Sequence, residues 1–208
     1  DVYKRQVRLW VQELQTALKR GDPELESLLD EACGEISTQV DRLQETANSF
    51  SNLVALERWE PEPVDLDQII DDTLAGLGVL ERRGIRIGRT SEAQVPPVVM
   101  GDRHWIRRAV SNLVQNSIDA LAGEPGSVEL TIGSSDESLT LTVEDTGGGV
   151  PDERLPELFS PHFSTTTAGS GLGLALVHQV VIRCHGRVSA ANGEQGLQVR
   201  LEFPVTNG

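Results

Sequence analysis

Apolar residues recur at steps of three and four along the first quarter of the chain, which is the spacing of one buried helical face. The longer seam runs from Asp22 to about Trp59, and Asp22 followed by Pro23 is typical of a helix N-cap with proline at the first helical position. A shorter seam precedes it and ends at Gly21. Two helices joined by a tight turn predict an antiparallel hairpin. The apolar positions of the longer seam are Leu25, Leu29, Ala32, Ile36, Val40, Leu43, Ala47, Phe50 and Val54.

The shorter helix can cover only part of the longer seam. We expect dimerisation to bury the remainder in a dimeric helical bundle, and we expect the first helix to begin upstream of this sequence. A plain coiled-coil spacer is the alternative interpretation of the same pattern.

The pattern changes after Pro61 and Pro63, which break the helix. Helices are predicted over residues 66–80, 102–121, 152–159 and 172–185, and strands over 84–88, 98–100, 128–132, 139–144, 187–191 and 197–203. The last four strands form two predicted hairpins. Strands with helices on one face predict a two-layer α/β sandwich over residues 61–208. With the helical hairpin over residues 1–60, the chain is expected to be α+β.

Composition limits the kinds of partner and the cellular location that the sequence predicts. The formal net charge is −14, the sequence pI is about 4.6, and no segment clusters Lys and Arg, so nucleic acid is not expected as a partner. No apolar run reaches the ~20 residues of a membrane helix and no signal peptide is present, so a cytoplasmic location without membrane contact is expected. Cys33 and Cys184 lie far apart in apolar helical surroundings and are expected to be reduced, buried thiols.

Two amides lie four residues apart in NLVQNSIDA, residues 112–120. Asn112 and Asn116 therefore share a face of the predicted helix, at the edge of its apolar stripe. An amide oxygen is a hard, neutral ligand for Mg²⁺, which usually completes its shell with waters and substrate phosphates. Two surface amides are the alternative explanation of the spacing.

A strand with good alternation leads into EDTGGGV, residues 144–150. A carboxylate at this place can accept a hydrogen bond from the exocyclic amine of adenine, and it would reject the carbonyl of guanine. Gly147 and Gly149 would let the backbone approach a flat base without a Cβ in between. An ordinary glycine-rich turn is the alternative.

The segment GSGLGLAL, residues 169–176, opens a predicted helix whose first N–H groups and positive dipole end can receive phosphate. It lacks the Lys-Ser/Thr pair of a Walker loop, and no strand runs directly into it as in a Rossmann fingerprint. The preceding PHFSTTTAGS, residues 161–170, has the small polar residues of a loop that closes over a ligand.

In this order the motifs resemble the nucleotide-binding domain of sensor histidine kinases, part of an ATPase superfamily shared with gyrase B, the ninety-kilodalton heat-shock chaperone and the MutL type of mismatch-repair protein. The resemblance covers residues 64–204. NLVQNSIDA is similar to the asparagine box, EDTGGGV and GSGLGLAL to the two glycine boxes, and LFSPHFS to the phenylalanine box. The final GRVSAANGEQGLQVRLEFP resembles the closing hairpin. Residues 1–60 resemble part of the dimerisation and phosphotransfer domain, and the FSTTT lid most resembles kinases of the nitrogen-response type.

The resemblance implies ATP and Mg²⁺ as cofactors. Asn116 would bind Mg²⁺, Asn112 would support the metal or the phosphates, and Asp145 would hold the adenine amine. Gyrase-type relatives carry a water-activating Glu at the position of Asn112, so the amide fits transfer to protein rather than hydrolysis. The residues implied in cofactor binding are Asn112, Asn116, Asp119, Asp145, Gly147, Gly149, Val150, Phe159, Phe163, Thr165, Thr166, Gly169, Ser170, Gly171, Leu172, Gly173 and Leu174.

The sequence departs from the family pattern at two places. The family's phosphoacceptor is a His in the first hairpin helix, and residues 1–60 contain none. We interpret the chain as a fragment that binds ATP but lacks the acceptor. The lid carries threonines where related kinases usually have Lys or Arg, so weaker ATP binding is expected, and Arg107, Arg108 and Arg154 are candidates to neutralise phosphate. The histidines present, for which structural or surface roles are expected, are His104, His162, His178 and His185.

The resemblance thus implies the catalytic core of a two-component sensor histidine kinase. The intact enzyme would transfer the γ-phosphoryl group of Mg-ATP to a His and then to an Asp of a response-regulator receiver domain. The chain would form a homodimer through the hairpin, and the parent is expected at the inner membrane with this region on the cytoplasmic side. One alternative is a non-catalytic dimeric module that uses ATP as a conformational ligand. Another, a Ser/Thr kinase of the anti-sigma type, is disfavoured by the long hairpin.

Overall fold

The computed structural model describes residues 58–75, 77, 84–161 and 171–205, together with the isolated positions Thr16, Leu29, Cys33 and Gly34. The chain divides into two compact units, Asp1–Val54 with Ala168–Ser170 and Ala55–Thr167 with Gly171–Gly208. The four isolated positions are helical, and the rest of the predicted hairpin lies outside the described residues.

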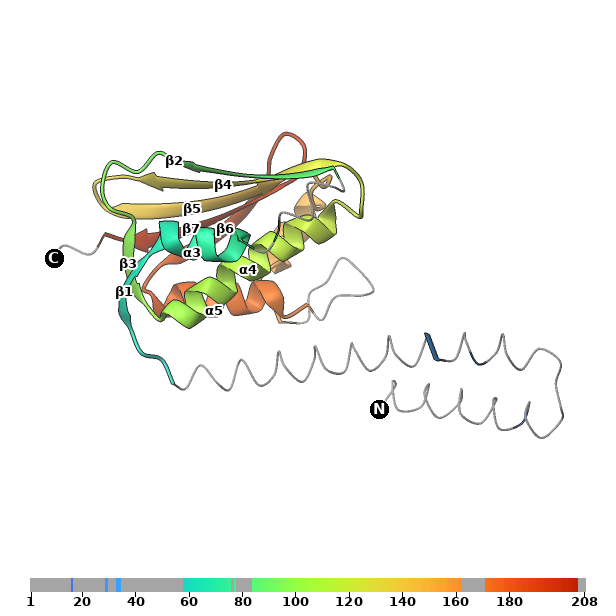
Figure 1. Cartoon of the computed structure of the whole chain (residues 1–208), viewed down its shortest axis with the longest axis horizontal. Helices are drawn as coiled ribbons and strands as arrows, with labels where there is room; N and C mark the ends of the chain where they lie inside the picture. Colours follow the sequence, from blue (N-terminus) through green and yellow to red (C-terminus); the bar gives the residue numbers. More distant parts are fainter. Residues whose placement is uncertain are drawn as a thin grey trace. The chain divides into compact units, whose positions relative to one another are not determined.

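The second unit is built on a five-stranded sheet in the order β2-β4-β5-β7-β6 (Figure 1). β2 pairs with β4 in parallel, and the other neighbours pair antiparallel. Both predicted hairpins, β4–β5 and β6–β7, are thereby confirmed. The strands are β2 Ile85–Ser91, β4 Gly126–Ser134, β5 Ser138–Asp145, β6 Arg187–Asn192 and β7 Leu197–Pro204.

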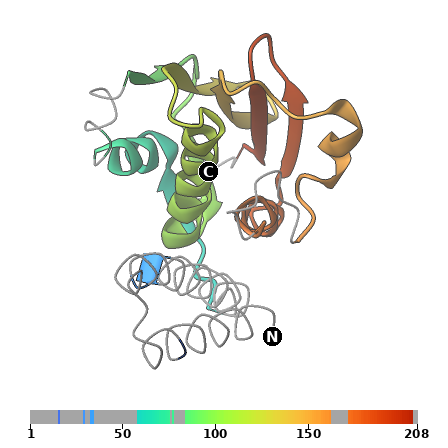
Figure 2. The ribbon, with the colours of Figure 1, turned by 90° about the vertical axis from the view of Figure 1, so that its right-hand side faces the viewer.

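Three helices cover one face of this sheet, as Figure 1 and Figure 2 show. The helices are α3 Leu66–Leu74, α4 Arg103–Ala120 and α5 Gly173–Arg183, and the short 3₁₀ helix η2 Asp152–Glu157 follows β5. The mixed sheet with its layer of helices confirms the predicted two-layer sandwich. In the part of the chain that the structure describes, no helix is long and apolar enough to cross a membrane.

The core lies between the sheet and the helices. Val128, Leu130 and Ile132 alternate along β4 and are at most 1% exposed, as a strand buried on one face requires. Ile106 and Leu113 of α4, each 2% exposed, belong to the same buried cluster. Burial of this stripe leaves the neighbouring face of α4 available to a ligand.

Asp102 fixes the start of α4. Its Oδ1 accepts hydrogen bonds from the backbone N–H groups of His104 (3.0 Å) and Trp105 (3.2 Å), which is an N-cap. Its Oδ2 accepts a further bond from the N–H of Glu60 (3.0 Å), where the chain enters the second unit. The helix predicted over residues 102–121 is confirmed, with Asp102 and Leu121 as its cap residues.

Two local predictions are wrong. Helix α3 ends at Leu74 rather than at residue 80, because the N–H of Leu77 turns back to the carbonyl of Leu74 and the glycines at 76 and 78 disfavour a helix. Cys33 is exposed rather than buried. The short helix predicted over residues 152–159 is confirmed as the 3₁₀ helix Asp152–Glu157, which contains Pro156.

The sequence interpretation missed strand β1 Glu62–Asp65, which pairs antiparallel with β3 Val98–Gly101. From the sequence, Pro61 and Pro63 were interpreted only as residues that end the preceding helix. A two-stranded sheet leaves one side of each strand without a ladder, so Pro63, which has no N–H, can be accommodated there. Asp65 then caps α3 by accepting the N–H of Asp67 (2.8 Å).

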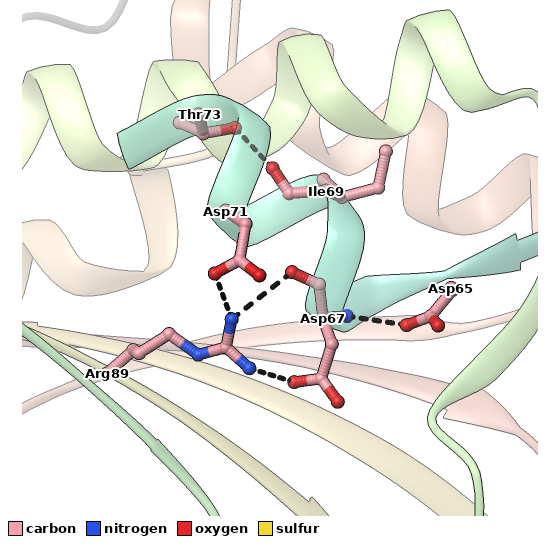
Figure 3. Close-up of polar contacts among 6 residues, drawn as sticks. All are labelled: Asp65, Asp67, Ile69, Asp71, Thr73 and Arg89. Carbon is pink, nitrogen blue, oxygen red and sulfur yellow. Dashed lines mark hydrogen bonds and ion pairs between the residues drawn. The ribbon is translucent and has the colours of Figure 1, made fainter. Parts of the chain in front are cut away.

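A guanidinium joins the edge strand β2 to helix α3. Figure 3 shows Arg89 between the carboxylates of Asp67 and Asp71. Its Nη2 lies 2.5 Å from Asp67 Oδ1, and its Nη1 bonds Asp71 Oδ1 and the carbonyl of Asp67 (3.4 Å). A paired network of this kind holds a partly exposed helix on a sheet edge more firmly than a single surface ion pair would.

Candidate functional site

The structure brings the two predicted amides to the start of α5. Asn112 is half-buried, Asn116 is exposed, and they lie one turn apart on α4. Asn112 Nδ2 donates a hydrogen bond to the carbonyl of Gly173 at 3.4 Å. A Cβ added at Gly173 would lie 3.7 Å from Nδ2 and Oδ1 of Asn116. The carboxamides of α4 and the first turn of α5 therefore border one site.

The first turn of α5 has the features of an anion site. Among the described residues no side chain caps its N–H groups, so these donors and the helix dipole are available to a ligand. Gly171 has a φ of +64°, a left-handed conformation that favours glycine. Leu172 is buried and Leu174 packs against the core. The leucines thus anchor the segment whose glycines lie beside the amides.

Asp145, at the end of β5, is a buried carboxylate with one committed oxygen. The residue is 4% exposed, and its Oδ1 accepts hydrogen bonds from the N–H groups of Gly147 (2.9 Å) and Leu197 (3.2 Å). Its Oδ2 receives no hydrogen bond from any residue in the described ranges. Buried polar atoms are normally paired, so Oδ2 can accept a hydrogen bond from a ligand donor such as an exocyclic amine.

The glycines after Asp145 are required by contacts within the protein. A Cβ at Gly147 would lie 2.7 Å from the backbone carbon and oxygen of Ala120, at the end of α4. A Cβ at Gly149, where φ is +72°, would lie 2.6 Å from Oδ1 of Asn192. The sequence interpretation assigned these glycines to the approach of a base. The structure adds a reason that is independent of any ligand.

Sequence reasoning missed Asn192, which ties the glycine turn to the end of β6. Its Oδ1 accepts the N–H of Val150 (3.0 Å), and its Nδ2 donates to the carbonyl of Val150 and to Asp152 Oδ1, both at 2.7 Å. The backbone N–H and carbonyl of Val150, one of the residues predicted to bind the cofactor, are thus both held by Asn192. The only sequence signal at Asn192 is the Asn-Gly pair, which marks a turn and says nothing of this distant contact.

Gly196 was also missed. A Cβ there would lie 2.1 Å from the carbonyl oxygen and 2.4 Å from Oδ1 of Asp145. The N–H of Gly148 also donates to the carbonyl of Gln195 at 3.0 Å. The β6–β7 turn therefore presses on the Asp145 turn, and only glycine at position 196 permits the approach that brings the N–H of Leu197 to the carboxylate.

The remaining predicted residues separate into two groups. Asp119 is exposed and accepts a hydrogen bond from Gln115 Nε2 (2.8 Å) within α4, and Phe159 is half-buried with its ring stacked 6.2 Å from that of His178 on α5. Phe159 thus holds the end of η2 against α5. The other predicted positions lie outside the described residues, and they are Phe163, Thr165, Thr166, Gly169 and Ser170.

Protein groups alone do not make a metal centre here. Within the described ranges, no group of three or more His, Cys, Asp or Glu side chains could hold an ion. His104 packs edge-on against Trp105, and His185 adopts a left-handed φ of 59° after α5. An ion at Asn112 and Asn116 would therefore need phosphate oxygens and waters to complete its shell, which is the coordination Mg²⁺ prefers.

The thiol of Cys184 is shielded. Burial and then the nearby negative charge of Asp102 raise its pKa to about 12. Cys33 and Cys184 are both free cysteines, as expected.

The comparisons with known proteins agree with this geometry. The family model described as "Histidine kinase-, DNA gyrase B-, and HSP90-like ATPase" matches residues 101–207, which is just over half of the chain. The chain is 28% identical to the sensor histidine kinase ZraS of Escherichia coli over 172 residues, which are 82% of this chain and 37% of that protein. It is 28% identical to the sensory histidine kinase/phosphatase NtrB of Rhizobium meliloti, covering 97% of this chain and 58% of that protein.

Solved structures show the same likeness. The catalytic domain of histidine kinase ThkA has a TM-score of 0.63 at 26% identity, covering 70% of this chain and 97% of that one. A structure of ThkA in complex with response regulator protein TrrA has a TM-score of 0.71 at 22% identity and covers 98% of this chain and 60% of that one, which shows a shared fold. The chain spans 37% to 58% of the length of the two curated relatives above.

Proposed function

The chain belongs to the histidine kinase-, DNA gyrase B- and HSP90-like ATPases as a histidine kinase catalytic domain of a two-component system, and we propose that residues 61–208 bind Mg-ATP for phosphoryl transfer to protein. The observation that carries this proposal is the buried Asp145, which has one oxygen held by two backbone N–H groups and the other without a partner among the described residues.

Adenine recognition would rest on Asp145. Its Oδ2 accepts the exocyclic amine, while the hydrogen bonds to Oδ1 prevent the carboxylate from turning. A guanine carbonyl at the same place would meet an acceptor with an acceptor, and the buried Oδ2 would be left unpaired. Such a mismatch strongly disfavours the wrong base.

The phosphates would lie between α4 and the first turn of α5. Asn116, with Asn112 beside it, would offer amide oxygen to Mg²⁺. The backbone N–H groups after Gly171, which no side chain of the described residues caps, would donate to the phosphates. Bound Mg²⁺ would neutralise part of the phosphate charge and orient the γ-phosphoryl group. The chain's own contribution is then mainly positioning and charge stabilisation.

In the intact protein, the bond between the γ-phosphorus and the β,γ-bridging oxygen would break as a bond to an imidazole nitrogen of a His forms. ADP would leave with the bonding electron pair, and the phosphoryl group would pass to an Asp of a response-regulator receiver domain. We further propose that residues 1–60 contribute a dimerising hairpin and that the regulator docks there. The complex of the similar protein ThkA with its response regulator supports this assignment of the partner.

Calorimetry of ATP binding, with and without Mg²⁺, tests the nucleotide site in wild type and in Asp145→Asn. An asparagine oxygen can still accept both backbone N–H groups, but its amide would present a donor to the donor of adenine. We expect Mg²⁺-dependent binding of ATP by the wild type, no binding of GTP, and loss of ATP binding in the variant with an unchanged unfolding temperature. Equal binding of ATP by both proteins would overturn the role of Asp145. No binding by either would overturn the proposed function.

A further inference from the structure

A triphosphate brings several negative charges to a chain whose own formal net charge is −14. The sequence supplies few cations near the proposed site: its lysines are Lys4 and Lys19, and residues 161–170, which precede the glycines of the site, contain neither Lys nor Arg. If residues 61–208 bind ATP as proposed above, arginines are therefore the permanently charged cationic side chains that can assist Mg²⁺ in neutralising the phosphates.

The cations of α4 differ in what already binds them. Arg103 pairs with Asp72 (3.1 Å) and bonds Gln68 (3.3 Å), so its charge is in use. Arg107 is exposed to solvent. Arg108 is half-buried, and it makes no hydrogen bond or ion pair with any residue in the described ranges. Outside α4, Arg154 on η2 lies 3.7 Å from Glu157. Arg108 is therefore the partly buried cation of α4 that lacks an acidic partner.

Arg108 also lies on the correct face. Positions 108, 112 and 116 are spaced by four, so Arg108 precedes Asn112 by one turn on the side that carries both amides. Its Cζ lies 5.9 Å from the ring centroid of Trp105, which is only 5% exposed and belongs to the core. The ring gives the guanidinium a fixed apolar support, and no described residue accepts a hydrogen bond from its N–H groups. Arg107 lies about 100° around the helix from it.

The surroundings of Arg108 favour an anionic ligand. Burial lowers its pKa from the ordinary value, because the cation has lost water without gaining a carboxylate. The group remains charged at neutral pH. An oxyanion delivered by a ligand would restore the lost electrostatic stabilisation, and a guanidinium can bind phosphate through two parallel hydrogen bonds.

We propose that Arg108 binds the γ-phosphate of ATP, one helical turn before Asn112 and two turns before Asn116, the residue that would bind Mg²⁺. In this role it supplies the cation that the preceding loop lacks. It distinguishes ATP from ADP, because ADP has no γ-phosphate to reach it. The adenine end of the ligand is unaffected.

The experiment compares dissociation constants for Mg-ATP and Mg-ADP in Arg108→Gln. Glutamine keeps an aliphatic stem over Trp105 and removes the charge. We expect affinity for ATP to fall about tenfold to a hundredfold, the range of one charged hydrogen-bonded contact, and affinity for ADP to change by less than about twofold. Arg108→Lys should recover part of the loss. Arg107→Gln, the matched control on the neighbouring face, should bind both nucleotides as the wild type does.

Each result decides the assignment. Equal losses for ATP and ADP in Arg108→Gln, unchanged binding of both, or the same ATP-selective loss in Arg107→Gln would overturn it. A purely structural role would lower the unfolding temperature without changing the ratio of ATP to ADP affinity. Wild-type protein that binds neither nucleotide would instead overturn the proposed function, so the two failures are distinct.

Discussion

The turn that follows β5 and the start of α5 differ in how the protein holds them. Around Asp145, the carboxylate, Asn192 and the β6–β7 turn are joined by several hydrogen bonds of 3.2 Å or less. At the start of α5, the described residues make one side-chain hydrogen bond, from Asn112 at 3.4 Å, and none of their side chains caps the helix. We call these the base end and the phosphate end.

The different chemistry of a base and of phosphates explains why the base end has more internal hydrogen bonds than the phosphate end. A base is recognised by shape and by one or two hydrogen bonds, so its pocket can be built in advance from neutral backbone groups. Phosphates bring their own charge and Mg²⁺, and a site with strong internal partners would compete with them. We therefore expect substitutions that break the hydrogen bonds or close contacts within the base end to lower stability, and substitutions at the phosphate end to change ligand binding with little effect on stability.

The largest expected contrast is between two glycine-to-alanine substitutions. Gly196→Ala places a Cβ 2.1 Å from the backbone of Asp145, so the turn must move, and the free energy of unfolding should fall by about 3 kcal/mol. Gly173→Ala meets nothing closer than 3.7 Å and should leave stability unchanged or slightly raised.

Urea unfolding and calorimetry of ATP binding measure both halves of this contrast. Gly196→Ala should lose ATP binding with its stability. Gly173→Ala should fold normally yet bind ATP more weakly, because its methyl group occupies space beside Asn116. If Gly196→Ala were stable and bound ATP as the wild type does, the close approach of the β6–β7 turn to Asp145 would not be needed for folding or binding.

The sequence predicts the phosphate end better than the base end. Asn112, Asn116 and the glycines of the α5 segment lie in regular helices or directly at a helix start, where spacing and turn chemistry set positions. The base end depends on Asn192 and Gly196, 40 or more residues from the groups they contact. Local periodicity carries no information about such contacts, so these residues were missed although the hairpin that holds them was predicted.

The same limit explains the errors in the fold. The helix 102–121 was predicted nearly to the residue, because Asp102 is a local cap and the apolar stripe is local. Strand β1 was missed because its partner, β3, lies more than 30 residues away in the sequence. Pro61 and Pro63 also make the segment resemble a helix break rather than a strand. The glycine at 147 was found, but the reason for it, contact with Ala120, is tertiary.

A second prediction extends the comparison along α5 to its far end. The thiol of Cys184 is buried there. Its pKa of about 12 lies above the pKa of a thiol in the unfolded chain, which is about 8.5. A raised pKa favours the protonated folded form, so its stabilisation is complete below pH 8.5 and is lost as pH rises toward 12. Unfolding free energy should fall by about 2 kcal/mol between pH 9 and pH 11.

The chain suits this measurement because few other groups titrate in that interval. Its lysines and tyrosine are Tyr3, Lys4 and Lys19, all before residue 20. Denaturant unfolding against pH, with Cys33→Ser as the background, isolates the thiol, and Cys184→Ala should remove the slope. A slope that persists in Cys184→Ala would assign the alkaline loss to another group.

The smallest expected contrast is between two asparagines. Asn192→Ala removes three hydrogen bonds of 2.7 to 3.0 Å at the base end, although the site is exposed, and should lower the free energy of unfolding by about 1–2 kcal/mol. Asn112→Ala removes one 3.4 Å bond and should change stability by less than about 0.5 kcal/mol. For Mg-ATP binding, calorimetry should show Asn112→Ala as the weaker binder of the two, because we propose that the amide of Asn112 supports the metal or the phosphates. If Asn112→Ala instead lost stability as Asn192→Ala does, the phosphate end would be as tightly built as the base end, and the distinction between them would fail.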